Sequence, residues 1–190
     1  MRSGSSLVAA VFLLLSCSSP FPAAAPSWAA AKDHPDVPAI LDRAESLFQA
    51  MKAHDYPAIF AALSAKSRET IVAETTSAIA AAAAQAPPGK PAGADTPPGP
   101  LPRDPVPGSE AIRSDFVAGG PIARDYWDAF LRRFDPDVAL EHSRWEIGSV
   151  KKDRAEILLT HHGADHPATL KMFREDGAWK TGLVETFWSR

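Results

Sequence analysis

One cluster of residues comes close to a metal-binding pattern: His161, His162 and His166. Neighbouring residues of a strand point to opposite faces, so His161 and His162 cannot chelate one ion while the backbone stays extended. The chain has one cysteine, which also excludes a zinc site built on several cysteines and any internal disulfide. We therefore expect a polar turn here, and neither a metal nor a cofactor.

A second group of residues has the types that acid–base catalysis uses. Asp125, Tyr126 and Asp128 are expected on one helix, and a carboxylate with a tyrosine can remove a proton next to a carbonyl group. Adjacent helix residues point about 100° apart, so the spacing favours acids in water and a packed Tyr126. The run Glu-His-Ser at 141–143 lacks the geometry of a catalytic triad, because its members are adjacent in sequence. We assign no catalytic residue.

The only cysteine follows an apolar segment near the start of the chain. Arg2 gives this start a positive charge, and Leu7–Leu15 form a nine-residue apolar run that is too short to span a bilayer. A small residue, Ser16, precedes Cys17. This pattern resembles the signal peptide of bacterial lipoproteins.

The resemblance implies how the chain is processed and where it resides. In that family the peptide is cut before the cysteine, which receives a diacylglycerol on sulfur and usually an acyl chain on its amine. Residues 1–16 would then be a signal peptide, Cys17 the lipid-attachment site and 17–34 a tether to the cell envelope, facing the periplasm. Ser18 after the cysteine, rather than an aspartate, favours the outer membrane by analogy with enterobacterial lipoproteins. The membrane is thus the expected partner of the acylated N-terminus.

Two other interpretations of this leader stay open. Ordinary secretion, with cleavage after Ala31, would give a mature start at Lys32 and the same compartment. About sixteen residues would then separate the apolar run from the cut, which is long for a signal peptide. Alternatively, Cys17 is an incidental thiol in a leader that is discarded.

Helical periodicity begins after the tether. Apolar residues recur at spacings of three and four from Val37 to Met51, which predicts an amphipathic helix. The run 54–57 ends this helix, Asp55 can cap the next one, and the apolar pattern continues to Leu63, so we predict a helical hairpin. Three further helices are expected at 64–86, 109–118 and 121–134, with a capped turn at 135–136 after them.

Residues 87–108 contain nine prolines and four glycines in 22 positions. This composition can hold neither a helix nor a sheet ladder. We expect an extended linker that interrupts a single α+β domain spanning 35–190, and that contributes little to folding because it has almost nothing to bury. Recognition of its prolines by an aromatic-lined partner is the alternative.

The apolar period changes to two after residue 144, which predicts four antiparallel strands. Their expected ranges are 145–151, 154–162, 167–175 and 178–188. The Asp-Gly pair at 176–177 indicates a two-residue hairpin turn. This turn sets three facing pairs: Leu170 with Leu183, Met172 with Thr181, and Arg174 with Trp179. The face that meets the helices should carry Leu170, Met172, Trp179, Leu183 and Phe187.

Two stretches carry a resemblance in fold: Leu-Phe-Gln-Ala-Met-Lys-Ala-His-Asp-Tyr at 47–56 and Phe-Arg-Glu-Asp-Gly-Ala-Trp-Lys-Thr at 173–181. A helical hairpin before a sheet with a Gly-x-Trp-Lys strand is similar to the nuclear transport factor 2-like cone fold. The resemblance implies an α+β domain whose N-terminal helices pack on a curved C-terminal antiparallel sheet of about four strands, around a pocket. Some members of that family are isomerases, cyclases or dehydratases, and many only bind a ligand or a partner.

Large apolar side chains would line such a pocket. The candidates for ligand binding are Tyr126, Phe130, Trp145, Leu170, Met172, Trp179, Leu183 and Phe187. Aromatic side chains offer an apolar ligand a large contact area, but residues of this kind more often build a core.

The net charge of -3 provides no positive field for phosphate backbones, so a nucleic-acid partner is not expected. We expect a lipid-anchored cell-envelope protein that binds a small apolar ligand or an envelope protein without catalysis. One alternative is a small cofactor-free enzyme, isomerase-like or cyclase-like, which would need an ionisable group with a reachable partner in the pocket. The other is an envelope assembly or structural factor, which an exposed apolar patch would indicate.

Overall fold

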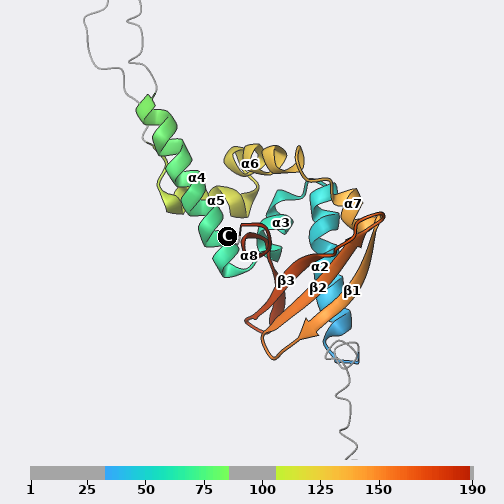
Figure 1. Ribbon diagram of the computed structural model, residues 1–190. Coiled ribbons are helices and arrows are strands. Elements are labelled where there is room, and N and C mark those ends of the chain that lie inside the picture. Colours follow the sequence, from blue (N-terminus) through green and yellow to red (C-terminus); the bar gives the residue numbers. More distant parts are fainter. Residues whose placement is uncertain (1–32, 86–105, 189–190) are drawn as a thin grey trace, which may run out of the picture.

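The computed structural model describes residues 33–85 and 106–188 and has an α+β architecture (Figure 1). Helices form its N-terminal part and an antiparallel sheet its C-terminal part, which confirms the predicted fold class. The helices before the sheet are α2 (Val37–Lys52), α3 (Tyr56–Ala62), α4 (Ala65–Gln85), α5 (Ser109–Ala118), α6 (Pro121–Leu131) and α7 (Pro136–Leu140). The remaining elements are β1 (Ser143–Val150), β2 (Arg154–His161), β3 (Ala168–Glu175), β4 (Ala178–Gly182) and α8 (Leu183–Phe187). Most of the predicted leader and linker lies outside the described residues.

The first two of these helices, α2 and α3, form the predicted hairpin. The apolar stripe of α2 is buried and consists of Ile40, Ala44, Leu47, Phe48 and Met51. The chain turns at His54, whose backbone has a φ of 53°, in the left-handed region. A carboxylate oxygen of Asp55 then accepts a hydrogen bond from the backbone N–H of Ala58 at 3.1 Å, which caps α3.

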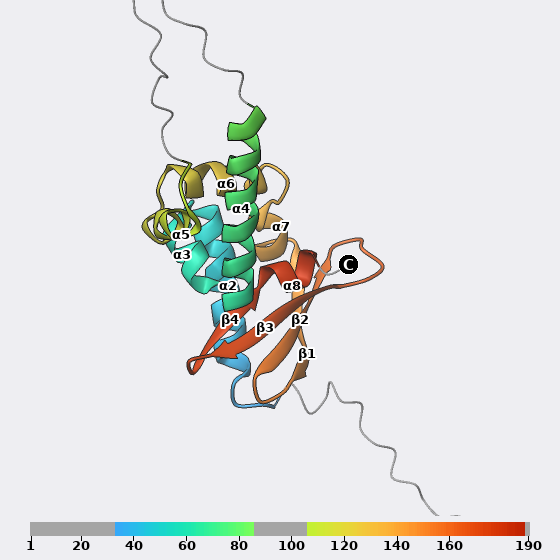
Figure 2. The same ribbon diagram turned by 90° about the vertical axis from the view of Figure 1, so that its left-hand side faces the viewer.

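One face of the sheet, which we call the inner face, is covered by α2 (Figures 1 and 2). The stripe of α2 joins one hydrophobic core with side chains of the first three strands: Ile147, Ala155, Ile157, Leu170 and Met172. Burial of this apolar area is the main stabilising contribution to the domain. The inner face is therefore occupied by side chains of the chain itself.

The four strands are arranged in the order β1-β2-β3-β4, joined as successive hairpins. Asp176 and Gly177 both have positive φ, 50° and 79°, the conformation that an Asp-Gly hairpin turn requires. The predicted pairs Met172 with Thr181 and Arg174 with Trp179 are confirmed.

The last strand is shorter than predicted, and this part of the prediction was wrong. Strand β4 ends at Gly182, and the chain turns into α8 instead of continuing to residue 188. Leu183 therefore does not face Leu170 across a strand pair, although both side chains are buried. Phe187, predicted on the inner face, is 47% exposed.

The contacts of α8 explain this difference. The carboxylate of Glu185 accepts hydrogen bonds from the hydroxyl groups of Ser64 at 2.9 Å and Ser67 at 2.6 Å. The Ser67 hydroxyl oxygen also accepts a hydrogen bond from the backbone N–H of Val184 at 3.0 Å. These bonds join the end of the described chain to the start of α4, and a continued strand would not make them.

A short helix, α7, forms in the region where only a turn is predicted. The side chain of Asp135 accepts a hydrogen bond from the backbone N–H of Asp137 at 2.9 Å, and Pro136 occupies the first turn. The cap was thus correctly predicted, but the helix was not. Helix α6 ends at Leu131, three residues earlier than expected.

Helix α4 leaves the body of the molecule along its length (Figure 2). Its first half contributes Ser67, Ile71 and Val72 to the buried interior, whereas its alanine-rich end is largely exposed. Within residues 33–85 and 106–188, no helix combines the length and apolar character that crossing a membrane would need.

Candidate functional site

A cavity of about 750 Å³ opens beside the hairpin turn, where α2, α3, α6 and α7 meet. Most of its lining side chains are polar or charged, and we call it the polar cavity. It is lined by Met51, Lys52, His54, Tyr56, Asp128, Leu131, Arg132, Asp135, Pro136 and Asp137. Its size is in the range of small-molecule sites.

Three side chains of the polar cavity form one hydrogen-bonded group. The hydroxyl of Tyr56 donates a hydrogen bond to Oδ1 of Asp128 at 2.7 Å, and Nδ1 of His54 lies 3.1 Å from the same hydroxyl. Nδ1 of His54 is 3.4 Å from Oδ1 of Asp128. The bond to Asp128 is the main cause that raises the pKa of Tyr56 above its ordinary value.

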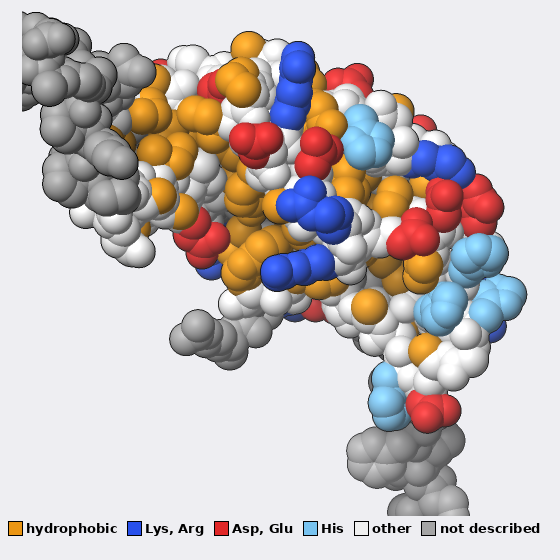
Figure 3. All heavy atoms as spheres, turned by 90° about the horizontal axis from the view of Figure 1, so that it is seen from above, with side chains coloured by type: hydrophobic (Ala, Val, Ile, Leu, Met, Phe, Trp, Pro, Cys, Tyr) orange, Lys and Arg blue, Asp and Glu red, His pale blue; other side chains and the backbone are white. Residues whose placement is uncertain are grey.

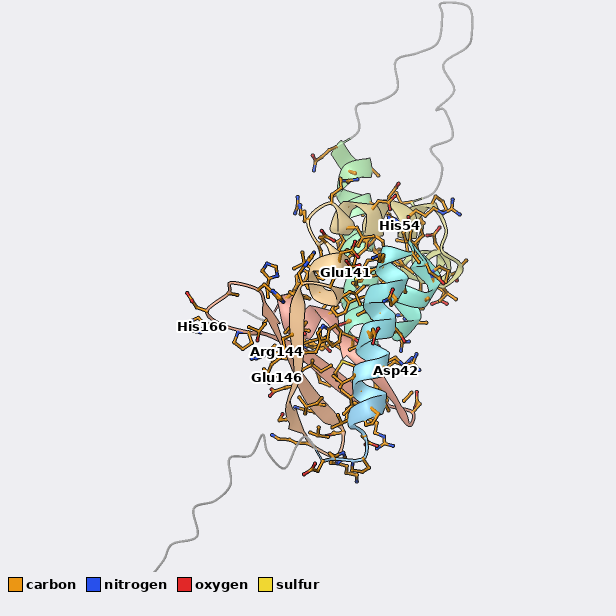
Figure 4. The ribbon with its side chains drawn as sticks, turned by 90° about the vertical axis from the view of Figure 1, so that its right-hand side faces the viewer. Asp42, His54, Glu141, Arg144, Glu146 and His166 are labelled. Atoms are coloured by element: carbon orange, nitrogen blue, oxygen red, sulfur yellow. The ribbon has the colours of Figure 1, made fainter. Side chains whose placement is uncertain are left out.

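A second charged group lies next to it. Nζ of Lys52 is 2.6 Å from Oδ1 of Asp137 and 2.7 Å from Oε1 of Glu141. The hydrogen bond with Asp137, and after it that with Glu141, raises the pKa of Lys52 above its ordinary value. Figure 4 shows His54 and Glu141 at the same end of the molecule.

The polar cavity combines charges of both signs with hydrogen-bond donors that water can reach. The side chains of His54 and Asp128 are 56% and 44% exposed. A histidine beside a carboxylate and a tyrosine can exchange protons with a bound group. The same side chains can hold a polar partner by hydrogen bonds and ion pairs without chemistry.

The eight residues predicted to bind a ligand lie elsewhere. Leu170, Met172, Trp179 and Leu183 are buried in the core, and Phe187 lies on the exposed side of α8. None of the eight lines the polar cavity or another cavity, which lies between α3, α4 and α5.

The three remaining predicted residues are half-buried and make aromatic contacts. The ring of Trp145 meets that of Phe48 edge-on at 5.5 Å, and its Nε1–H donates a hydrogen bond to the carbonyl oxygen of Ala139 at 2.7 Å. Phe130 stacks on the exposed Trp188 with ring centroids 6.3 Å apart. Tyr126 packs edge-on against Phe116 at 5.4 Å. These contacts pack the three rings against neighbouring side chains of the domain.

The three members of the acid–tyrosine group lie on one helix, α6, as predicted, but their side chains have different surroundings. Asp125 is exposed, Tyr126 packs among aromatic rings, and Asp128 faces the polar cavity. The tyrosine that meets Asp128 is Tyr56, from a different helix. Sequence reasoning missed His54, Tyr56 and Lys52 because the acidic residues that they meet, Asp128, Asp137 and Glu141, lie 72 residues or more away along the chain.

His161, His162 and His166, the cluster considered for a metal, are exposed side chains around the β2–β3 connection. Nδ1 of His161 lies 3.1 Å from the carbonyl oxygen of His142. Figure 3 shows several histidine side chains grouped on the surface, and Figure 4 places His166 at the tip of the connection, pointing away from the body. In the part of the chain that the structure describes, no group of three or more His, Cys, Asp or Glu side chains is arranged to hold a metal ion.

Comparison with models of protein families, with curated proteins and with solved structures finds no match to this chain. The similarities to bacterial lipoproteins and to the cone fold therefore remain predictions. Cys17, the predicted lipid-attachment site, lies outside the described residues.

Proposed function

We propose that the chain is a lipid-anchored protein of the cell envelope whose folded domain binds a partner at the polar cavity without catalysing a reaction. The observation that carries the proposal is the position of the ionisable groups. The inner face of the sheet is filled by α2, and the His54–Tyr56–Asp128 group lies at the surface, within reach of water. Catalytic acids and bases usually work where water is excluded, whereas a recognition surface stays wet.

The direction in which α2 runs supports the anchored arrangement. The predicted tether leads to the start of α2 at Val37, and the polar cavity lies at the other end, around Met51 and Lys52. A helix of 16 residues is about 24 Å long. An anchor at Cys17 would thus leave the polar cavity on the side of the domain away from the attachment point.

Mass spectrometry of the native mature protein tests the anchor. We expect an N-terminal Cys17 that carries acyl chains, and loss of acylation with accumulation of the precursor in the Cys17→Ala variant. An unmodified mature start at Lys32 would overturn the anchoring part of the proposal.

Photocrosslinking in cells tests the binding part. We would place p-benzoylphenylalanine at Arg132, an exposed residue that lines the polar cavity, and at Asp42, an exposed residue on the far half of α2 (Figure 4), as the matched control. The expected result is a discrete cross-linked species from position 132 that weakens when Asp128→Asn is added. Identical products from both positions, or none from position 132, would contradict binding at this cavity.

A second candidate function, acid–base catalysis, is favoured by the 2.7 Å contact between Tyr56 and Asp128 beside His54. A suitable probe is 5-nitrobenzisoxazole, whose ring opens when a base removes one proton. If the polar cavity contains a working base, both His54→Gln and Asp128→Asn slow this ring opening. Rates equal to that of the wild type in both variants would remove the candidate.

A further inference from the structure

The second cavity, of about 580 Å³, lies on the other side of α3, where α3, α4 and α5 meet. Two arginines from different helices line it, Arg68 from α4 and Arg113 from α5, and we call it the arginine cavity. Phe60, Pro57 and Val117 provide apolar lining. Cationic and apolar groups are therefore combined in one space.

Both arginines are weakly paired. Nη2 of Arg68 lies 3.9 Å from Oε2 of Glu175, and Nε of Arg113 lies 3.9 Å from Oε2 of Glu110. Charge-assisted hydrogen bonds are much shorter, about 2.7–2.9 Å. Within the described residues no carboxylate lies closer to either guanidinium, so their donors are available to a bound anion.

The neighbouring carboxylates are engaged elsewhere. Both oxygens of Glu175 accept from the backbone N–H of Ala65, at 2.9 and 3.0 Å, which caps the start of α4. Asp55, the one acid that lines the arginine cavity, accepts from the backbone N–H of Ala58 at 3.1 Å. Glu110 is a highly exposed residue in the first turn of α5. Two of the three acids thus accept hydrogen bonds from backbone N–H groups, and the third is exposed to water.

Further positive charge lies at the edge of the arginine cavity. Nζ of Lys180 donates a hydrogen bond at 2.7 Å to the carbonyl oxygen of Ala61, a lining residue. Burial is the main cause that lowers the pKa of Lys180, and the charges of Arg43 and Arg68 lower it further. The negative charge of an anion bound beside Arg68 would offset the repulsion between Lys180 and these two arginines.

The apolar lining can take the body of a ligand. The ring of Phe60 is buried and stacks on that of Phe116 at 5.1 Å, so it is a fixed surface. The side chain of Val117, in contrast, is 62% exposed, and covering it would remove apolar area from water.

We propose that the arginine cavity binds an amphiphilic organic anion. A single carboxylate or sulfonate group lies between Arg68 and Arg113, whose planar guanidinium groups suit such oxygens, and an aromatic or short aliphatic body covers the exposed side chains of Pro57 and Val117. This site is separate from the polar cavity and depends neither on the anchor nor on the function proposed there.

Two fluorescent probes of the same skeleton test the charge requirement: 8-anilinonaphthalene-1-sulfonate and N-phenyl-1-naphthylamine, which lacks the sulfonate. The protein is the full chain made by cell-free synthesis, which carries no acyl chain that could compete. We expect saturable binding of the sulfonate with one site per chain, and binding of the neutral probe at least tenfold weaker. Equal affinities for the two probes would refute an anion site.

Matched variants then locate the site. Arg68→Gln and Arg113→Gln should each weaken binding of the sulfonate about tenfold, since each removes charge-assisted hydrogen bonds, whereas Arg133→Gln, an exposed arginine outside the cavity, should leave it unchanged. Val117→Asp, at an exposed position, should weaken binding of both probes. Unaltered binding in both glutamine variants would overturn the assignment. Far-ultraviolet circular dichroism separates these effects from unfolding, and Arg113→Lys, which keeps the charge but not the planar donors, should recover only part of the affinity lost in Arg113→Gln.

Discussion

The two tyrosines of the chain are kept protonated by different surroundings. Burial raises the pKa of Tyr126 to about 12, and the negative charge of Glu74 adds to the effect. The pKa of Tyr56 is raised chiefly because its hydroxyl donates a hydrogen bond to Asp128. The ionisation of Tyr126 thus reports on packing, and that of Tyr56 reports on the polar cavity.

The ionisation of these tyrosines can be monitored by absorbance at 295 nm. The pKa of Tyr126 is about 12 in the folded state and 10.0 as its ordinary value. Its contribution to stability is therefore fully present below pH 10 and is lost as the pH rises through about 12. We expect Tyr126→Phe to remove the component near pH 12, and Asp128→Asn to move the Tyr56 component towards its ordinary value. An ionisation near pH 10 in the Tyr56→Phe variant would show that Tyr126 is not buried.

Trp179 is the residue on which the sheet register can be tested. It is buried, and the guanidinium carbon of Arg174, its partner in the β3–β4 pair, lies 5.9 Å from the ring centroid. Trp179→Ala should lower the free energy of unfolding by about 3–5 kcal/mol. Lys152→Ala, in the exposed β1–β2 turn, should change it by less than about 0.5 kcal/mol. Urea denaturation measures both, and similar small losses would contradict the register.

At the scale of the element, α8 depends on one carboxylate. Glu185→Ala removes the acceptor of two serine hydroxyls and leaves the buried Ser64 and Ser67 without it. We expect a loss of about 1.5–3 kcal/mol in the free energy of unfolding. Glu45→Ala, on the exposed side of α2, is the control and should be close to neutral. If the two variants unfold alike, these bonds do not stabilise the domain.

The elements that the sequence predicts well are those determined by local chemistry. The apolar spacing of α2 and the Asp-Gly turn at 176–177 depend on neighbouring residues alone, so both could be inferred. Helix α8 could not, because Glu185 meets serines that lie 121 and 118 residues earlier in the chain. The polar cavity escaped prediction for the same reason, since Tyr56 and Asp128 come together only in the fold. One local signal was present: an acid, Asp128, on a helix that is otherwise largely aromatic and apolar.

At the scale of the whole molecule, the predicted linker can be tested for its contribution to stability. We would replace residues 87–105 by a glycine–serine segment of equal length and keep Gly108, the N-terminal cap of α5. The unfolding midpoint should change little, because loop length and composition have a weak effect on stability. Deletion of residues 183–190, which removes the buried Leu183 and Val184, is the destabilising control. A decrease as large as that of the control would show that the replaced segment packs on the domain.

The exposed end of α4 has a consequence for amide hydrogen exchange. The helix is continuous from Ala65 to Gln85, but its buried residues lie in the first half, around Ile71 and Val72, and Ile79 is its last hydrophobic side chain that packs against the core. Turns of helix without tertiary contacts are marginal in water, even when they are rich in alanine. Amides in the first half should therefore exchange as slowly as those of the core, whereas amides at 80–85 should exchange by local fraying, nearly as fast as in a free peptide. One geometric element is thus expected to behave as two units in solution.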